Sequence, residues 1–340
     1  MYIITGAAGF IGSALLRALN KRGVTNILAV DNLGQSEKWR NLVKGDYLAY
    51  LRREDFIERI REDNLLDSLE PEFGPPGFPG GISRVRAIFH LGACSSTTER
   101  NADYLIQNNL TYSKILCDYA LRRGIRYIQA SSAATYGDGG QGFDDDAAKL
   151  SSLRPLNMYG YSKHLFDLWA LRTHRLESIA SVKFFNVYGP NEYHKGEMRS
   201  MAHKAFGQVR QQGKIRLFKS RRADYADGGQ LRDFIYVKDC AEILLKLAEK
   251  PGANGIFNLG TGRARSWNDL AAAVFAAMEV RPDIEYIPMP EELQGKYQYF
   301  TQAGMKRLEE ALEEPLAFHT LEAGVADYLR NYLLTEDAYL

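Results

Sequence analysis

The segment that most restricts the fold of this chain is a glycine-rich turn close to its amino terminus. Tyr2–Thr5 is a short run of apolar and strand-forming residues, and the sequence TGAAGFIG occupies residues 5–12. Residues 10–22 then carry apolar side chains at helical spacing, and Gly23 follows as a stop signal. A strand, a glycine turn and a helix in this order predict the first unit of a dinucleotide-binding parallel sheet.

The three glycines of this turn have separate physical roles. Gly6 permits a tight turn, Gly9 lets the backbone approach a pyrophosphate, and Gly12 allows the helix to pack closely on the strand. The start of the helix also presents unpaired N–H groups and the positive end of its dipole. We therefore expect the phosphates of a cofactor to lie at this turn.

The first half of the chain continues to alternate between strand and helix patterns. Helical stretches lie near residues 101–123 and 157–176, and further strands are predicted at 27–30, 86–90, 126–130 and 181–185. This alternation predicts an α/β protein with a Rossmann-type, doubly wound parallel sheet and helices on both faces. A ligand then lies at the carboxyl ends of the strands, near the point where the strand order reverses.

The later part of the chain follows a less regular pattern. We expect residues 1–190 with about 234–264 to form the cofactor-binding domain, with Phe234–Leu259 returning to the main sheet. About 191–233 and about 265–340 are then a smaller, discontinuous substrate-binding lobe. Pro71–Ser83 is rich in proline and glycine and is predicted to be a surface loop rather than a helix or an inner strand.

Composition excludes several classes of protein. Of 340 residues, 45% are hydrophobic and 25% are charged, which rules out a mainly disordered chain. A formal net charge of +1 gives no reason to expect nucleic-acid binding, and no apolar run approaches the roughly 18 residues of a membrane span. Cys94, Cys117 and Cys240 are too scattered for a disulfide framework or a metal site. We expect a cytoplasmic protein with reduced thiols, without a signal peptide.

A second motif carries acid–base chemistry. Tyr159 and Lys163 are four residues apart and share one face of the predicted helix, whereas Tyr161 points elsewhere. An adjacent ammonium and a positively charged nicotinamide ring would both lower the pKa of a phenol from its usual value near 10. Ser132, at the end of a predicted strand, is the hydroxyl that we expect to bond the reacting oxygen, with Ser131 as second choice.

The residues expected to bind the adenosine part of the cofactor are compatible with either NAD or NADP. The second strand ends at Asp31 and Asn32, and an acid at this position accepts a hydrogen bond from the ribose and favours NAD. Lys38 and Arg53 follow, and either cation would offset the 2′-phosphate of NADP. These residues alone do not decide between NAD and NADP.

Several segments together resemble the extended short-chain dehydrogenase/reductase family, whose epimerases and dehydratases act on nucleotide sugars. The resemblance covers nearly the whole chain and rests on Ser132, Tyr159 and Lys163 and on the sequences TGAAGFIG (5–12), FFNVYGP (184–190), RDFIYVKD (232–239) and FNLGTG (257–262). A closer likeness is to the branch of ADP-heptose 6-epimerases, through HLGACSSTTE (90–99), SSAATYG (131–137), PLNMYGYSK (155–163), NVYGPNEYHKG (186–196) and GKYQYFTQA (295–303).

The resemblance implies a self-contained redox cycle. Bound NADP takes hydride from C6 of the heptose in ADP-D-glycero-D-manno-heptose, and the resulting ketone receives the hydride on its other face. Such an inversion implies two acid–base residues, and Tyr159 and Lys195 match these positions. It also implies a homo-oligomer that makes a lipopolysaccharide precursor.

The family's other functional positions can be carried over to this chain. For the cofactor these are Gly6, Gly9, Phe10, Ile11, Gly12, Asp31, Asn32, Lys38, Arg53, Leu91, Gly92, Ala93, Cys94, Ser95, Asn108, Lys163 and Val187. For the ADP-sugar they are Asn186, Lys204, Phe218, Arg232 and Tyr297. For Arg232, a structural ion pair with Asp233 or another acid is the alternative interpretation.

Three other functions compete with this interpretation. A 4-epimerase-type enzyme is compatible with the same motifs, and Glu197, Lys204 and the long segment 219–230 depart from the 6-epimerase pattern. A dehydratase is disfavoured, because Ala133 and Ala134 stand where related dehydratases carry a proton-transferring acid pair. A non-catalytic NADP-sensing protein would be expected to lack Tyr159 or Lys163.

Overall fold

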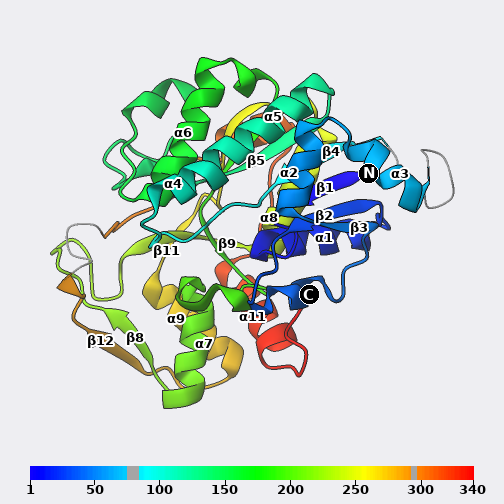
Figure 1. Ribbon diagram of the computed structural model, residues 1–340. Coiled ribbons are helices and arrows are strands. Elements are labelled where there is room, and N and C mark those ends of the chain that lie inside the picture. The colour runs from blue at the N-terminus through cyan, green and yellow to red at the C-terminus, as the bar shows by residue number, and fades with distance from the viewer. Residues whose placement is uncertain (75–83, 292–296) are drawn as a thin grey trace.

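The main sheet of the protein contains seven parallel strands. The computed structural model describes residues 1–74, 84–291 and 297–340 (Figure 1). Across the sheet the order is β10-β6-β5-β4-β1-β2-β3. The strands are β1 (Tyr2–Thr5), β2 (Ile27–Asp31), β3 (Ala49–Arg52), β4 (Ala87–His90), β5 (Arg126–Ser132), β6 (Ala180–Phe184) and β10 (Gly255–Leu259).

Helices cover both faces of this sheet. The helices α1 (Phe10–Lys21) and α8 (Val237–Glu249) pack against each other on one face. On the other face lie α2 (Arg53–Arg61), α5 (Tyr112–Arg122) and α6 (Met158–Arg172). Strands β1, β2 and β4 are mostly apolar and fully buried, as a sheet covered on both faces requires. The doubly wound α/β fold is thus confirmed.

The strand order reverses between β1 and β4. From β1 the chain proceeds outward to β2 and β3, and from β4 it proceeds the other way to β5 and β6. The glycine turn follows β1, and the loop from Leu91 to Ser95 follows β4. Both segments therefore lie at the edge where a doubly wound sheet binds its ligand.

Two helical segments differ in detail from the predictions. The helix expected over residues 101–123 contains α4 (Ala102–Leu105) and α5, but a π-helical turn at Ile106–Thr111 separates them. The prediction of a loop over Pro71–Ser83 is wrong for its first residues, because helix α3 (Leu65–Phe73) includes Pro71. The proline removes only one hydrogen bond in the last turn, and buried Leu65 and Leu69 hold the helix. Residues 75–83 lie outside the described ranges.

A three-stranded sheet stands beside the main one. Strand β9 (Leu231–Tyr236) pairs with β7 (Asn186–Tyr188) and with β11 (Ala264–Ser266). Phe234–Leu259 was expected to return to the main sheet, and it does so through β10, whereas its first residues belong to β9 in this smaller sheet. The physical reason is that β9 has β7 as a parallel neighbour, which the sequence pattern did not reveal.

A second cluster of buried apolar residues lies among the remaining elements, in the lower half of Figure 1. It involves α7 (Met201–Gln212), α9 (Trp267–Met278), α11 (Leu321–Tyr328) and the strands β8 (Ile215–Phe218) and β12 (Ile284–Ile287). Helix α10 (Lys306–Leu312) instead packs with β10 on the larger core. The exact two-lobe division stays a prediction. Over the described ranges, no helix has the length and apolar character needed to span a bilayer.

Candidate functional site

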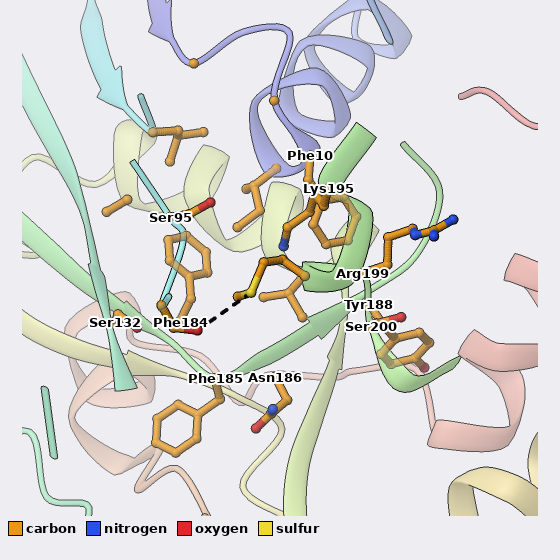
Figure 2. A pocket seen from close by; sticks show the side chains of 18 of the residues that line it. Phe10, Ser95, Ser132, Phe184, Phe185, Asn186, Tyr188, Lys195, Arg199 and Ser200 are labelled. Carbon is orange, nitrogen blue, oxygen red and sulfur yellow. Dashed lines mark hydrogen bonds between the residues drawn. The ribbon is translucent and has the colours of Figure 1, made fainter. Parts of the chain in front are cut away.

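A cavity of about 670 Å³ lies at the carboxyl edge of the main sheet. Its walls come from the glycine turn, the β4 loop, the end of β5, α6 and the segment after β7 (Figure 2). Most of the predicted site residues line it together: Gly6, Gly9, Phe10, Ile11, Gly12, Asp31, Lys38, Leu91, Gly92, Ala93, Ser95, Ser132, Tyr159, Lys163, Asn186, Val187 and Lys195.

The glycine turn has the geometry of a phosphate cradle. Gly6 has φ of +72°, and a Cβ there would lie 2.6 Å from the amide nitrogen of Gly92. At Gly12 a Cβ would lie 2.0 Å from the carbonyl oxygen of Gly6. The first hydrogen bond of helix α1 runs from Ser13 N to Gly9 O. The amides before Ser13 in this helix therefore have no helical partner and face the turn. These residues fit a dinucleotide pyrophosphate.

Gly12→Ala is expected to damage this cradle. Because the new methyl group overlaps the Gly6 carbonyl, the turn must open, and cofactor affinity should fall at least about 10-fold, or roughly 1.4 kcal/mol. Calorimetric titration of the cofactor measures this change. Gly207→Ala is the matched control, since Gly207 lies in α7 with open space around it. Unchanged cofactor affinity in the Gly12 variant would contradict the assigned role.

The Asp31 carboxylate is held by groups from three segments. Its Oδ2 accepts from Ala8 N at 2.9 Å, within the glycine turn. Its Oδ1 accepts from Asn32 N at 2.7 Å and from Lys38 Nζ at 2.6 Å. The Lys38 ammonium therefore compensates the Asp31 charge at the wall of the cavity.

Three further predicted cofactor residues lie close to one another near Asp31 but do not line the cavity. They are Asn32, Arg53 and Asn108. Asn32 Oδ1 accepts from Arg53 N at 3.1 Å, and the Arg53 guanidinium donates to Asn108 Oδ1. Arg53 also forms an ion pair of 2.7 Å with Glu54. Cys94 likewise does not line the cavity, and its backbone is held by Asn109 through two hydrogen bonds of 2.9 Å.

The predicted acid–base pair lies at the start of α6. Tyr159 and Lys163 both line the cavity, whereas Tyr161 is 45% exposed on another face. Lys163 Nζ donates to Ala130 O at 2.7 Å. Burial lowers the pKa of Lys163 to about 8.

Burial opposes the expected lowering of the Tyr159 pKa. Burial raises the pKa of this phenol above 10, and a hydrogen bond with Ser132 opposes the rise. We expected the Lys163 ammonium to lower the pKa, but that ammonium is occupied by the carbonyl of Ala130. Loss of solvation is the largest influence on the pKa of this phenol.

The two candidate serines have different partners. Ser132 Oγ accepts from Ala134 N at 3.1 Å and lies next to Tyr159. Ser131 Oγ donates to Asp167 Oδ2 at 2.7 Å, away from substrate chemistry. The geometry therefore favours Ser132, our first choice, although Ser131 also contributes to the cavity wall.

Lys195 enters the same cavity from a different segment. It belongs to a short 3-10 helical segment, Tyr193–Met198, and its ammonium lies 5.2 Å from the centre of the Phe10 ring. Figure 2 shows Lys195 beside Phe10 and extending into the cavity, with Ser132 at another side. Burial lowers the pKa of Lys195, and the nearby Glu192 carboxylate opposes that shift. A buried amine with a lowered pKa gives up its proton more readily than a solvated lysine does.

Three of the predicted substrate residues, Phe218, Arg232 and Tyr297, form an aromatic cluster next to the cavity. The buried Arg232 guanidinium lies 5.1 Å from the Tyr297 ring centre and 5.6 Å from that of Trp267. Trp267 lines the cavity and donates to Tyr297 OH at 2.8 Å, and Tyr297 contacts Phe218 edge to face. Asp233 is not the partner of Arg232, because its carboxylate accepts backbone amides.

Lys204, a predicted substrate residue, does not line the cavity. Its ammonium lies 3.5 Å from the exposed Glu197 carboxylate.

Sequence analysis also missed several residues that do line the cavity: Thr97, Phe184, Phe185, Tyr188, His194, Met198, Arg199, Ser200, Phe234, Trp267 and Leu270. For those between Phe184 and Ser200, nearness in the sequence to Lys195 or to the FFNVYGP segment was the available signal, whereas Trp267 and Leu270 are distant from both. Burial lowers the pKa of His194 to about 4.

A parallel doubly wound sheet, a phosphate cradle and a tyrosine–lysine pair in one cavity define a nicotinamide-dependent oxidoreduction site. Residues 2–67 and 81–260 match the NAD dependent epimerase/dehydratase family. The chain belongs to this family, and within it the chain is an epimerase.

Two bacterial relatives, both named ADP-L-glycero-D-manno-heptose-6-epimerase, are similar to this chain over their full length. The ADP-L-glycero-D-manno-heptose-6-epimerase of Nitratidesulfovibrio vulgaris strain DP4 is 55% identical over 340 residues, covering all of both chains. That of Fusobacterium nucleatum subsp. nucleatum is 43% identical over 349 residues, again covering both. The crystal structure of the Helicobacter pylori ADP-L-glycero-D-manno-heptose-6-epimerase has 26% identity and a TM-score of 0.75, covering 97% of this chain and 95% of that one.

Proposed function

We propose that this protein inverts C6 of the heptose in ADP-D-glycero-D-manno-heptose and forms the L-glycero epimer through a transient ketone. The observation that carries the proposal is that Tyr159 and Lys195, from distant segments, line one cavity with the phosphate cradle. Inversion needs a proton-exchanging group for each face of the carbon, or rotation of the ketone past one such group. The full-length similarity to ADP-heptose epimerases supports the substrate.

The cofactor fits the cradle described above. Gly6, Gly9 and Gly12 with the start of α1 would hold its pyrophosphate, and Lys163 its nicotinamide ribose. When bound, NADP would supply hydride acceptance and return at C6. We propose the cytoplasm as the location and a homo-oligomer as the assembly.

The chain's own residues then manage protons and orientation. Ser132 would donate to the oxygen on C6 and keep it beside the phenol of Tyr159. Tyr159 and Lys195 would each exchange a proton with that oxygen, one for each orientation of the sugar. Arg232, with Phe218 and Tyr297, would hold the ADP portion, because a guanidinium donates to a diphosphate in a fork geometry.

NADP rather than NAD is supported by the ion pair at the adenosine end. Lys38 neutralises Asp31, so a 2′-phosphate would not face an uncompensated carboxylate. Lys38→Ala should therefore weaken NADP binding by about 10-fold or more, as expected for a charge-assisted hydrogen bond, and NAD binding by much less. Titration of both cofactors measures the ratio, with Lys44→Ala as control because Lys44 pairs with Asp337. Equal losses for NADP and NAD would refute the contact.

The substrate assignment has a direct test against the 4-epimerase alternative. The purified protein is incubated with ADP-D-glycero-D-manno-heptose or with UDP-galactose, and products are resolved chromatographically. We expect the L-glycero epimer from the first and no turnover of the second. Turnover of UDP-galactose alone would establish a 4-epimerase, and cofactor binding without turnover of any nucleotide sugar would indicate an NADP-sensing protein.

A further inference from the structure

A fully buried ion pair lies directly behind the candidate catalytic residues. Asp167 is on α6, one turn after Lys163, and Lys183 is on β6. Lys183 Nζ lies 3.3 Å from Asp167 Oδ2, and both side chains have no solvent exposure. Neither residue lines the cavity or has a part in the proposed proton transfers.

The carboxylate end of this pair holds strand β5. Asp167 Oδ2 accepts from Ser131 Oγ at 2.7 Å, and Asp167 Oδ1 accepts from Ser181 Oγ at 2.7 Å. Both carboxylate oxygens therefore receive hydroxyl protons, and the Lys183 ammonium compensates the charge. This arrangement ties α6 to the neighbouring strands β5 and β6.

The ammonium end holds the residues that follow β5. Lys183 Nζ donates to Thr135 Oγ1 at 2.5 Å, and Thr135 Oγ1 donates to the carbonyl oxygen of Ser132 at 2.8 Å. A hydroxyl has one proton, so this direction satisfies both bonds. The ammonium also lies 4.7 Å from the centre of the Tyr136 ring.

Ser132 is consequently fixed from both sides. The preceding residue, Ser131, is held by Asp167, and the carbonyl of Ser132 itself is held through Thr135 by Lys183. A buried ion pair is weak ground for stability, because desolvation offsets its attraction and apolar residues of similar volume are often as stable. Its effect on the position of Ser132 is a separate matter.

We propose that Asp167 and Lys183 are positioning residues that hold the Ser132 hydroxyl against Tyr159 for the reaction. The inference rests on the proposed function, since Ser132 and Tyr159 receive their roles there. A displacement of about 1 Å in a reacting group costs on the order of 100-fold in rate. Removal of the pair should thus lower kcat more than it changes KM.

The first experiment removes both charges together. Either single substitution would leave one buried charge uncompensated and would destabilise the fold, so the double variant Asp167→Leu, Lys183→Met is used. We expect a folded protein with cofactor affinity and KM near wild type and kcat lowered about 10- to 100-fold. The matched control is Lys238→Met, Asp327→Leu, which removes the 2.5 Å ion pair between α8 and α11 away from the cavity. Its kcat should be unchanged.

A second variant keeps the inference testable if the double variant does not fold. Thr135→Val removes the hydroxyl link and leaves the ion pair in place, and Thr135→Ser restores the hydroxyl. We expect kcat to fall at least about 3-fold in the valine variant, in keeping with one net hydrogen bond, and to recover in the serine variant.

The outcomes separate this inference from the proposed function. Inactive wild-type protein with ADP-D-glycero-D-manno-heptose would defeat the proposed function. Active wild type with kcat unchanged in the folded double variant, or in Thr135→Val, would overturn the positioning role alone. Equal losses in the valine and serine variants would also overturn it, because the hydroxyl would then be irrelevant.

Discussion

Tyr159→Phe is expected to lower the turnover of ADP-D-glycero-D-manno-heptose by about 10²- to 10⁴-fold, the range for loss of a general acid or base. The substitution removes one hydroxyl and little volume from a site whose phenol lies next to Ser132. Burial raises the pKa of that phenol, and the substitution removes the hydroxyl that would transfer a proton. Steady-state kinetics of epimer formation measures the effect.

The tyrosine prediction has a control on the same helix. Tyr161→Phe alters a hydroxyl on the exposed face of α6 and should leave kcat unchanged. Thermal unfolding and cofactor titration of the Tyr159 variant should match wild type, which shows that the loss is chemical. Full activity in Tyr159→Phe would remove this residue from the mechanism.

Lys195→Met is expected to lower epimerisation by at least about 10²-fold while cofactor binding persists. The methionine keeps a long side chain beside Phe10 but cannot exchange a proton. Because burial lowers the pKa of the Lys195 amine, its charged form is already disfavoured, and the variant should not lose thermal stability.

The lysine prediction is checked by comparing epimer formation with cofactor affinity in one preparation. Lys214→Met is the control, because Lys214 pairs with Glu285 at the surface. Loss of cofactor affinity with intact turnover would mean that Lys195 is a binding residue. Unchanged turnover would leave Tyr159 to serve both orientations of the sugar, by rotation of the ketone alone.

The fold was predictable where local patterns agree with the tertiary structure. The glycine turn specifies close backbone contacts that only glycine tolerates, so Gly6 and Gly12 predict the first unit of the sheet. Strand β3 was missed because Ala49–Arg52 is a partly exposed edge strand without a strong apolar run. The neighbour of β9 was missed because strand pairing is a long-range property.

The site was predictable as a set of residue types, but not as a set of interactions. The spacing of Tyr159 and Lys163 follows from helical geometry, whereas the direction of the Tyr159 pKa shift depends on burial, which a motif does not reveal. Asp167 and Lys183 are ordinary charged residues in the sequence, and their pairing requires α6 and β6 to pack together. Lys195 was suggested only by the family resemblance.

The central claim is that inversion at C6 proceeds by removal and return of one hydride within the cavity. The most direct measurement uses ADP-D-glycero-D-manno-heptose with deuterium at C6, followed by mass spectrometry and NMR of the product formed in ordinary water. We predict an L-glycero epimer that retains deuterium at C6. An epimer whose C6 deuterium has been replaced by solvent hydrogen would contradict the account.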